Sequence, residues 1–369
     1  MLGEEIEQTQ RRVRTDAYQM SIGEVVSMYQ ASELVINPDF QRLFRWTSSQ
    51  KSRLLESILL GIPLPSIFVF ETEEGKWELI DGLQRVSTIL EFMGVLRQPD
   101  GGLAEPSVLE GTKYLPSLHS VVWERSERIT DVPVEEQVEL SKANQLAVRR
   151  ARLGVEILKR PSDNKTKYDL FQRLNAGGTQ ANAQELRNCI IIMVNEQFFR
   201  DVKAAAESEP FSAVVAITPE QAERQRHMEM AVRFLVHTHV PYDGTLDVEE
   251  YIDDGIVTLA SAPATAGLVI GLHLTFDLLN QAAGADALRR FDNGRHTGKI
   301  GLVGLEGIAV GMAKNLGAIQ ALPNPVEFTR NRIREFWEQP ELDTFISPGL
   351  RGTTRIQRTV PFGARWFRP

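Results

Sequence analysis

The chain has 369 residues, enough for about two domains with full hydrophobic cores. Hydrophobic residues make up 42% and charged residues 24%, which argues against disordered, collagen-like and polytopic membrane proteins. The 41 Lys and Arg against 49 Asp and Glu give a formal charge of −8, so a chain-wide basic field for nonspecific nucleic-acid binding is absent. The single cysteine, Cys189, excludes an internal disulfide framework and a cysteine-based zinc cluster. We therefore expect a cytoplasmic protein.

Two segments bear on membrane association. Residues 1–16 alternate acids with arginines and have no apolar core, so we expect neither a signal peptide nor an anchor there. Residues 255–276 contain no acidic or basic side chain and are long enough to cross a bilayer. Pro263 interrupts this run and would break a single helix. A pair of buried helices, and no membrane partner, is therefore predicted.

The first half of the chain is predicted to mix helices and strands. A capping box formed by Thr47 and Gln50 opens a helix whose apolar positions end at Gly61. Residues 66–71 and 77–80 are β-rich runs separated by a short polar loop, the pattern of a hairpin. This half therefore contains at least one helix and one hairpin.

The second strand of that hairpin continues into Asp81-Gly82-Leu83-Gln84-Arg85, beyond which apolar residues repeat at helical spacing until Gly94. A helix that starts here offers unpaired N–H groups and the positive end of its dipole to a phosphate. Gly82 permits a close approach, and Arg85 can add a charge-assisted hydrogen bond. Asp81 could hold Mg²⁺ together with water and phosphate oxygens. The alternative is that Asp81 caps the helix and Arg85 pairs with an acid.

Further elements follow along the chain. Residues 98–116 are rich in Gly and Pro and are expected to form a loop. Beyond this loop the pattern predicts a charged helix over 132–152, a strand over 153–158, a helix ending at Asn175, and a helix over 186–194 opened by a capping box of Asn182 and Glu185. From about residue 198 only helices are expected, including residues 220–239, 266–283 and 302–316.

A second group of polar residues lies upstream of the turn. Gln41, Arg42 and Arg45 are interleaved with the aromatic residues Phe40, Phe44 and Trp46. Arginines and an amide beside aromatic rings suit a nucleotide, with the guanidinium groups on phosphate. The alternative for the aromatic residues is core packing.

Several segments together resemble one family, the N-terminal domain of GmrSD-type modification-dependent restriction endonucleases. The resemblance rests on Phe40-Gln41-Arg42 with Trp46, residues 54–65, residues 81–85, and residues 171–178 leading to 185–188. It implies an α+β fold with a ParB/sulfiredoxin-like N-terminal domain. With the helical pattern that follows, we expect a nucleotide-binding domain over residues 1–200, an all-helical domain over 201–350 and a basic aromatic tail over 351–369.

For function, the resemblance implies NTP binding and Mg²⁺-dependent NTP hydrolysis, coupled to phage defence against foreign or modified DNA. Asp81 and Arg85 match the family's Asp-Gly-Gln-Gln-Arg signature and are the expected catalytic residues, and the carboxylate chemistry of the turn makes Asp81 the expected metal ligand. The nucleotide-binding positions match Gln41, Arg42, Gly82, Gln84, Arg85, Asn175 and Arg187. Leu83 departs from the family, in which glutamine is common at this place. Asn175 and Arg187 either close the site or brace it.

The second half departs further from many relatives, which carry an HNH nuclease domain there. Such a site needs closely spaced His and Asn residues. His296 is the last histidine, and no cluster follows it. His237 and His239 are two residues apart, so a helix points them to different faces, and we do not expect a metal pair. We therefore expect a separate nuclease subunit as partner.

Two other functions remain open. The first is a nucleotide-sensing or protein-interaction module that does not hydrolyse its ligand. The second is a DNA-binding protein or nuclease that acts through the ParB-like fold; the charge of −8 disfavours it, whereas five arginines in residues 351–369 favour it. Because that tail also carries Phe362, Trp366 and Phe367, we expect it to dock, preferably on its own domain or a partner protein.

Overall fold

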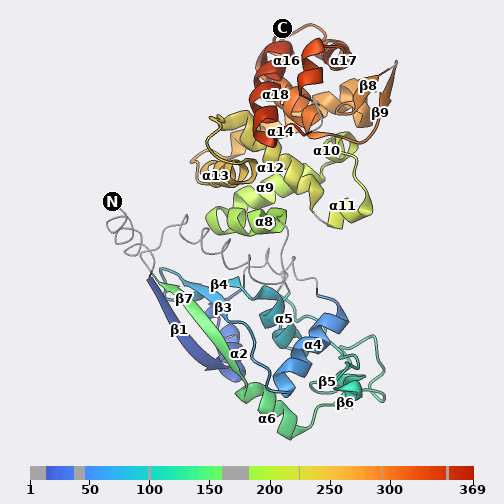
Figure 1. Ribbon diagram of the computed structural model, residues 1–369. Coiled ribbons are helices and arrows are strands. Elements are labelled where there is room, and N and C mark those ends of the chain that lie inside the picture. The colour runs from blue at the N-terminus through green and yellow to red at the C-terminus, as the bar shows by residue number, and fades with distance from the viewer. Residues whose placement is uncertain are drawn as a thin grey trace. The chain divides into compact units, whose positions relative to one another are not determined.

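The structure is a computed structural model that describes residues 14–36, 46–98, 101–159, 183–223, 225–292, 294–345 and 349–369. The chain divides into two compact units, Met1–Gln180 and Ala181–Pro369. The first mixes helices and strands, and the second is mostly helical (Figure 1). The sequence pattern placed the boundary near residue 200. The boundary in the structure lies earlier in the chain, because α8 (Ala183–Val194) belongs to the second unit. It packs there against α9 (Glu196–Glu207) and α13 (Val248–Ala260).

A five-stranded sheet forms the centre of the first unit, with the strand order β1-β7-β3-β4-β2. Its strands are β1 (Arg14–Ser21), β2 (Leu34–Val35), β3 (Ile67–Glu71), β4 (Trp77–Asp81) and β7 (Arg152–Lys159). β1 is antiparallel to β7 and β3 is antiparallel to β4, whereas β7–β3 and β4–β2 are parallel pairs. The predicted hairpin and the predicted strand over 153–158 are confirmed. The ParB-like fold implied by the resemblance stays a prediction.

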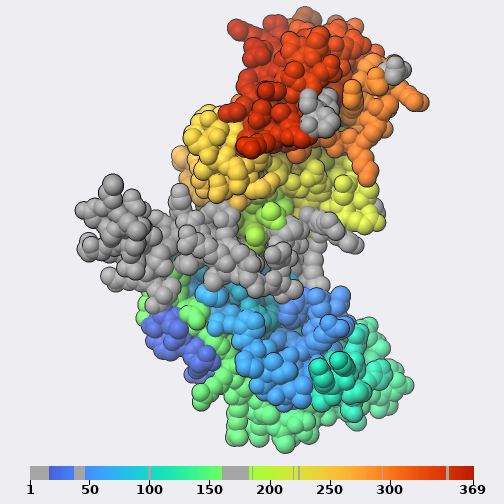
Figure 2. Space-filling view, viewed as in Figure 1, coloured from blue at the N-terminus to red at the C-terminus, as the bar shows by residue number. Residues whose placement is uncertain are grey.

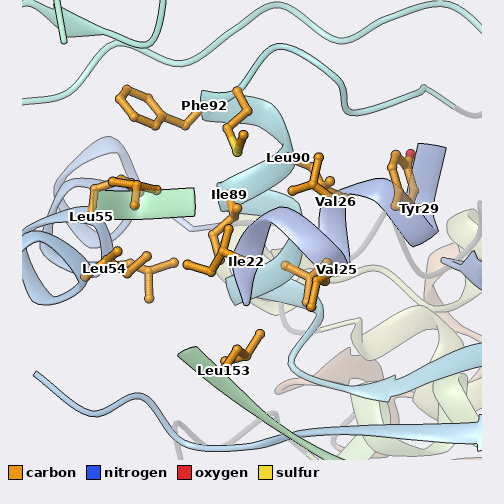
Figure 3. Packing of buried hydrophobic residues seen from close by; sticks show 14 of the residues in the cluster. Ile22, Val25, Val26, Tyr29, Leu54, Leu55, Ile89, Leu90, Phe92 and Leu153 are labelled. Atoms are coloured by element: carbon orange, nitrogen blue, oxygen red, sulfur yellow. The ribbon is translucent and has the colours of Figure 1, made fainter. Parts of the chain in front are cut away.

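Helices cover one side of this sheet (Figure 1). They are α2 (Ile22–Gln30), α4 (Ser48–Leu59), α5 (Leu83–Phe92) and α6 (Lys142–Arg150). Figure 3 shows Ile22 and Val25 of α2, Leu55 of α4 and Leu90 of α5 gathered on the same side of Leu153 in β7. At about 25 cal/mol per Å² of apolar surface, the burial of these side chains holds the helices on the sheet. The predicted Thr47–Gln50 capping box is present at the start of α4.

The segment between α5 and α6 is largely irregular. It contains the 3-10 turn η1 (Pro116–Leu118) and the paired short strands β5 (Val121–Val122) and β6 (Val138–Glu139). The predicted helix over 132–152 is therefore wrong for its first half. Gln137 is buried and donates to the carbonyls of Ser126 and Val132, which holds this stretch in a turn, and Ser141 caps α6.

The second unit is built from helices and one hairpin. Its remaining helical elements are α10 (Glu209–Val214), α11 (Pro219–Glu223), α12 (Arg226–His239), α14 (Ala266–Ala283), η2 (Gly284–Asp286), the π-helix η3 (Gly304–Ala309), α15 (Val310–Ala313), α16 (Leu316–Gln320), α17 (Pro325–Phe336), η4 (Pro340–Thr344) and α18 (Gly352–Trp366). The hairpin of β8 (Arg290–Asp292) and β9 (Arg295–Thr297) corrects the all-helical prediction. It projects from the surface of this unit (Figure 2).

Three sequence-based expectations for this unit have definite outcomes. The predicted helix pair around Pro263 is confirmed as α13 and α14, and no described helix is long and apolar enough to cross a membrane. The single helix over 220–239 is wrong, because Gln225 has a φ of 60° and separates α11 from α12. The tail folds into α18, which packs against η3 and α15. This confirms the expected docking, within the chain's own helical unit.

Candidate functional site

The predicted strand-to-helix turn is present. Asp81 is the last residue of β4 and lies opposite Phe68 of β3, and Gly82 starts α5 with a φ of 96°. A Cβ atom on Gly82 would lie 2.4 Å from Cγ2 of Ile67, so both the backbone conformation and the close packing require glycine. Gly82 supplies no side-chain cap to α5. The first backbone N–H groups of a helix have no partner within the helix itself, and at α5 no side chain of the capping residue receives them.

Arg85 is the central side chain of this turn. Its Nη2 lies 3.0 Å from Oδ2 of Asp81, which is four residues earlier, at the end of β4. Its Nη1 donates to the carbonyl of Ser66 at 3.0 Å and also to the carbonyl of Pro65. Burial lowers the pKa of Arg85, and the charge of Asp81 opposes that effect. The arginine thus pairs with an acid and ties the loop before β3 to the start of α5.

The pair still has unused hydrogen-bonding capacity. Oδ1 of Asp81 and Nε of Arg85 make no hydrogen bond to any residue that the structure describes. The side chains are 27% and 14% exposed respectively, so both are partly accessible. Asp81 does not cap α5, since Gly82 is the capping residue. The sequence left open that Arg85 pairs with an acid and that Asp81 caps the helix. The ion pair is present, and the cap is not.

Gln84 connects the upstream motif to the turn. Its Oε1 accepts a hydrogen bond from the backbone N–H of Trp46 at 3.2 Å. This contact places the end of the motif over residues 37–46 beside the start of α5. Gln41 and Arg42, the two predicted nucleotide ligands of that motif, lie outside the described residues. Leu83, where the family commonly has glutamine, packs against the hydrophobic core.

Arg187 lies in the helical unit, on α8. It is 1% exposed; its Nε lies 2.5 Å from Oδ1 of Asp253, and its Nη2 pairs with Glu249. Both carboxylates belong to α13. These ion pairs hold α8 against α13, and the two roles considered for Arg187 at the nucleotide site, closing it or bracing it, stay predictions. Asn175, the other residue of that motif, lies outside the described part of the chain.

His237 and His239 both lie in the last turn of α12. His237 is 2% exposed, and burial is the main cause that lowers its pKa to about 3. Burial also lowers the pKa of His239. Across the described ranges, no group of three or more His, Cys, Asp or Glu could hold a metal ion. Among the described residues Asp81 belongs to no such group, so a Mg²⁺ ion at Asp81 would also need ligand oxygens and water.

Sequence reasoning missed the carbonyl groups that receive Arg85. Pro65 and Ser66 lie about twenty residues before it, and a backbone oxygen leaves no trace in residue type. The ion pair between Lys51 of α4 and Glu91 of α5, at 2.6 Å, was also missed. The sequence signal that could have indicated this ion pair is that each residue lies on the polar face of a predicted helix.

These features define a class, a mixed α/β domain in which an aspartate and an arginine meet at the glycine that starts a helix after a strand. Residues 22–192 match the sequence model described as the GmrSD restriction endonuclease, N-terminal domain. The match confirms the resemblance for this part of the chain and supports a component of a restriction-type defence system. No curated protein and no solved structure matches the chain.

Proposed function

We propose that the chain is an NTP-binding and NTP-hydrolysing component of a restriction-type system that acts against foreign or modified DNA in the cytoplasm. The observation that carries the proposal is the Asp81–Arg85 pair at the Gly82 start of α5, within the segment that matches the restriction endonuclease domain. A separate chain supplies the nuclease.

The geometry of the turn supports phosphate binding. The N–H groups at the start of α5 and the positive end of its dipole favour an anion, and the positive φ of Gly82 sets the chain direction at this helix start. Nε of Arg85 is available as a charge-assisted donor while Nη1 and Nη2 keep the guanidinium in place. Because the guanidinium is already held in place, less side-chain entropy is lost when the ligand binds.

Asp81 is the proposed metal ligand, through its unused Oδ1. Mg²⁺ bound there would neutralise charge on the phosphates. Gln41, Arg42, Gln84 and Asn175 are proposed as further nucleotide contacts. Arg187 is proposed to position α8, because its hydrogen bonds to Asp253 and Glu249 hold that helix against α13.

The first test measures nucleotide binding and phosphate release with a panel of NTPs and Mg²⁺. Arg85→Ala should reduce NTP affinity at least tenfold, the amount expected for loss of a charge-assisted phosphate contact. Asp81→Asn should retain binding and lose Mg²⁺-dependent turnover. The matched control is Lys159→Ala, which breaks the exposed ion pair with Asp16 at the β1–β7 edge of the same sheet and should leave both measurements unchanged.

Stability has to be followed in the same variants. Arg85→Ala also loses the hydrogen bonds to Pro65 and Ser66, so this variant should be less stable than the parent. Binding is therefore compared at a temperature at which both proteins are folded. Equal NTP affinity in parent and Arg85→Ala under those conditions would refute the phosphate contact.

A second candidate function is nucleotide sensing without hydrolysis. The observation in its favour is that Leu83 packs against the core, where an amide in relatives could contact a ligand. Tight NTP binding with no phosphate release by the parent protein, with or without Mg²⁺, would select this alternative. Cleavage of modified or plain DNA by the isolated chain would instead select direct nuclease action and remove the need for a separate subunit.

A further inference from the structure

The helical unit contains a cavity of its own. Its volume is about 320 Å³, and it is formed by the loop between α10 and α11, the start of α12, and the residues after β9. Figure 1 shows α10, α11 and the β8–β9 hairpin on the same side of this unit. A cavity of this size is at the lower end of the range that small-molecule ligands occupy.

Three cations line the cavity. Arg226 comes from the start of α12, Arg289 precedes β8, and Lys299 follows β9. Ile217, Met230 and Ile300 supply apolar parts of the wall. The lining thus offers positive charge together with apolar surface, the combination that a small molecule with a phosphate and an organic body requires.

The positive charge is only partly compensated. Nη1 of Arg226 pairs with Glu229 at 2.7 Å, and Nη1 of Arg289 pairs with Asp286 at 2.8 Å. Lys299 is exposed and has no carboxylate partner among the described residues. Three cations therefore face two carboxylates. Nη2 of each arginine also makes no hydrogen bond within the described chain, so donors remain for an anionic ligand.

The wall of the cavity is held in place before any ligand binds. Nε of Arg289 donates to the carbonyl of Gly298 at 2.9 Å. This hydrogen bond fixes the arginine against the segment that includes Lys299. On the opposite side, the backbone N–H of Thr218 donates to the side chain of Gln221 at 3.1 Å, and the N–H of Gln221 donates back to Thr218 at 3.4 Å. A fixed wall lowers the entropic cost of binding.

We propose that this cavity binds a phosphorylated small molecule of mononucleotide size. The phosphate is received by Arg226, Arg289 and Lys299, and the organic part lies against the apolar wall. The site is independent of the proposed NTP site, because all its residues belong to the helical unit. Arg226 also pairs with Glu229, which in turn pairs with Arg233, so the ligand engages one end of the ion-pair network of that unit.

The experiment uses the full chain and AMP as probe, with adenosine and inorganic phosphate as comparisons. Isothermal titration should show that AMP binds at least tenfold more tightly than adenosine or phosphate alone. Lys299→Ala should weaken AMP binding about tenfold, since it removes one charge-assisted contact. Arg295→Ala is the matched control, because Arg295 is an exposed cation of the same hairpin that does not line the cavity. It should leave the affinity unchanged.

Hydrogen exchange locates the ligand and separates this proposal from the proposed function. AMP should protect residues 215–218 and 298–300 in the parent and in Arg85→Ala alike. Protection confined to residues 64–93 would overturn the cavity proposal and leave the NTP site standing. Equal AMP affinity in the parent, Lys299→Ala and Arg295→Ala would also overturn it. Lys299 has no side-chain partner in the described part of the chain, so this variant is expected to fold.

Discussion

His237 is a buried histidine with unusual surroundings. Neither of its ring nitrogens has a hydrogen-bond partner among the described residues, and the ring stacks on Tyr251 with the ring centroids 5.6 Å apart. Burial lowers its pKa to about 3, and the charges of Arg233, Arg355 and Lys314 act in the same direction. The residue therefore packs as a neutral aromatic ring.

The low pKa of His237 predicts that the helical unit loses stability in mild acid. An unfolded histidine has a pKa near 6.5, so between about pH 6.5 and pH 3 the unfolded state binds a proton that the folded state does not. The free energy of unfolding should fall by up to about 1.4 kcal/mol per pH unit in this range. His237→Phe keeps the ring and removes the titration, so its unfolding free energy should depend less on pH between 7 and 4.

Denaturant unfolding at pH 7, 6, 5 and 4 measures this effect. His273→Gln is the control, because His273 is exposed and its replacement should retain the pH dependence of the parent. Parallel pH profiles for His237→Phe and the parent would contradict the assignment of His237 as the acid-sensitive group.

At the residue scale, the sequence predicted where the turn residues lie better than it predicted which groups they contact. The pattern of the hairpin and of the following helix placed Asp81, Gly82 and Arg85 correctly, because strand and helix periods are local properties. The pairing of Arg85 with Asp81 was open, since one helical turn separates them and other acids were available. The carbonyls of the loop before β3 were beyond prediction, because only the folded chain brings them close.

At the element scale, alternating charges connect three helices of the second unit. Glu229 pairs with Arg226 and Arg233 within α12, and Glu249 of α13 pairs with Arg233 and with Arg187 of α8. Burial alone would raise the pKa of Glu229, but the hydrogen bonds and charges of its two arginines outweigh burial and lower the pKa. The network is thus charged at neutral pH and joins α8, α12 and α13.

Removing Arg187 should destabilise this network strongly. Arg187→Ala leaves Asp253, which is 7% exposed, without its arginine partner, and breaking a buried pair in this way costs about 3–5 kcal/mol. The control is Lys203→Ala, which removes a long, exposed pair with Glu207 and should cost less than about 1 kcal/mol. Denaturant unfolding of both variants checks the difference. Similar losses in the two would mean that the buried pair contributes no more than a surface pair.

Helices with strong local signals were predicted well, and breaks between elements were not. The capping box of Thr47 fixed the start of α4 from neighbouring residues alone. The break at Gln225 has no Gly or Pro to mark it, because a glutamine adopts the positive φ there. β1 was also missed, since its charged and exposed side chains, including Tyr18 at 49% exposure, give no alternating apolar pattern.

At the scale of the whole molecule, the basic C-terminal segment is an integral part of the helical unit. Arg355 of α18 contacts both carboxylate oxygens of Glu306, at 2.9 and 3.0 Å, and Thr359 donates to the same group at 2.8 Å. Glu306 is 1% exposed. Phe362 packs against Phe336, with ring centroids 5.7 Å apart. Positive charge in this segment is thus used partly to neutralise a buried acid.

Deleting residues 351–369 should therefore unfold the helical unit, because it leaves Glu306 buried without a cation. Phe362→Ala is the milder change and should lower the free energy of unfolding by about 3–5 kcal/mol. Arg368→Ala, at an exposed position, is the control and should leave stability unchanged. If the deletion keeps full stability and instead removes salt-sensitive DNA binding, the segment is a nucleic-acid arm.

The pairing of β1 with β7 has a consequence for how the protein is made. β1 lies at the edge of the sheet, and among the described strands its one partner is β7, from Arg14 opposite Lys159 to Ser21 opposite Arg152. A nascent chain therefore exposes β1 without a partner until more than a hundred further residues have been synthesised. Closing so long a loop is entropically costly and slow, so the sheet of the first unit is completed late and its first strand depends longest on protection from aggregation.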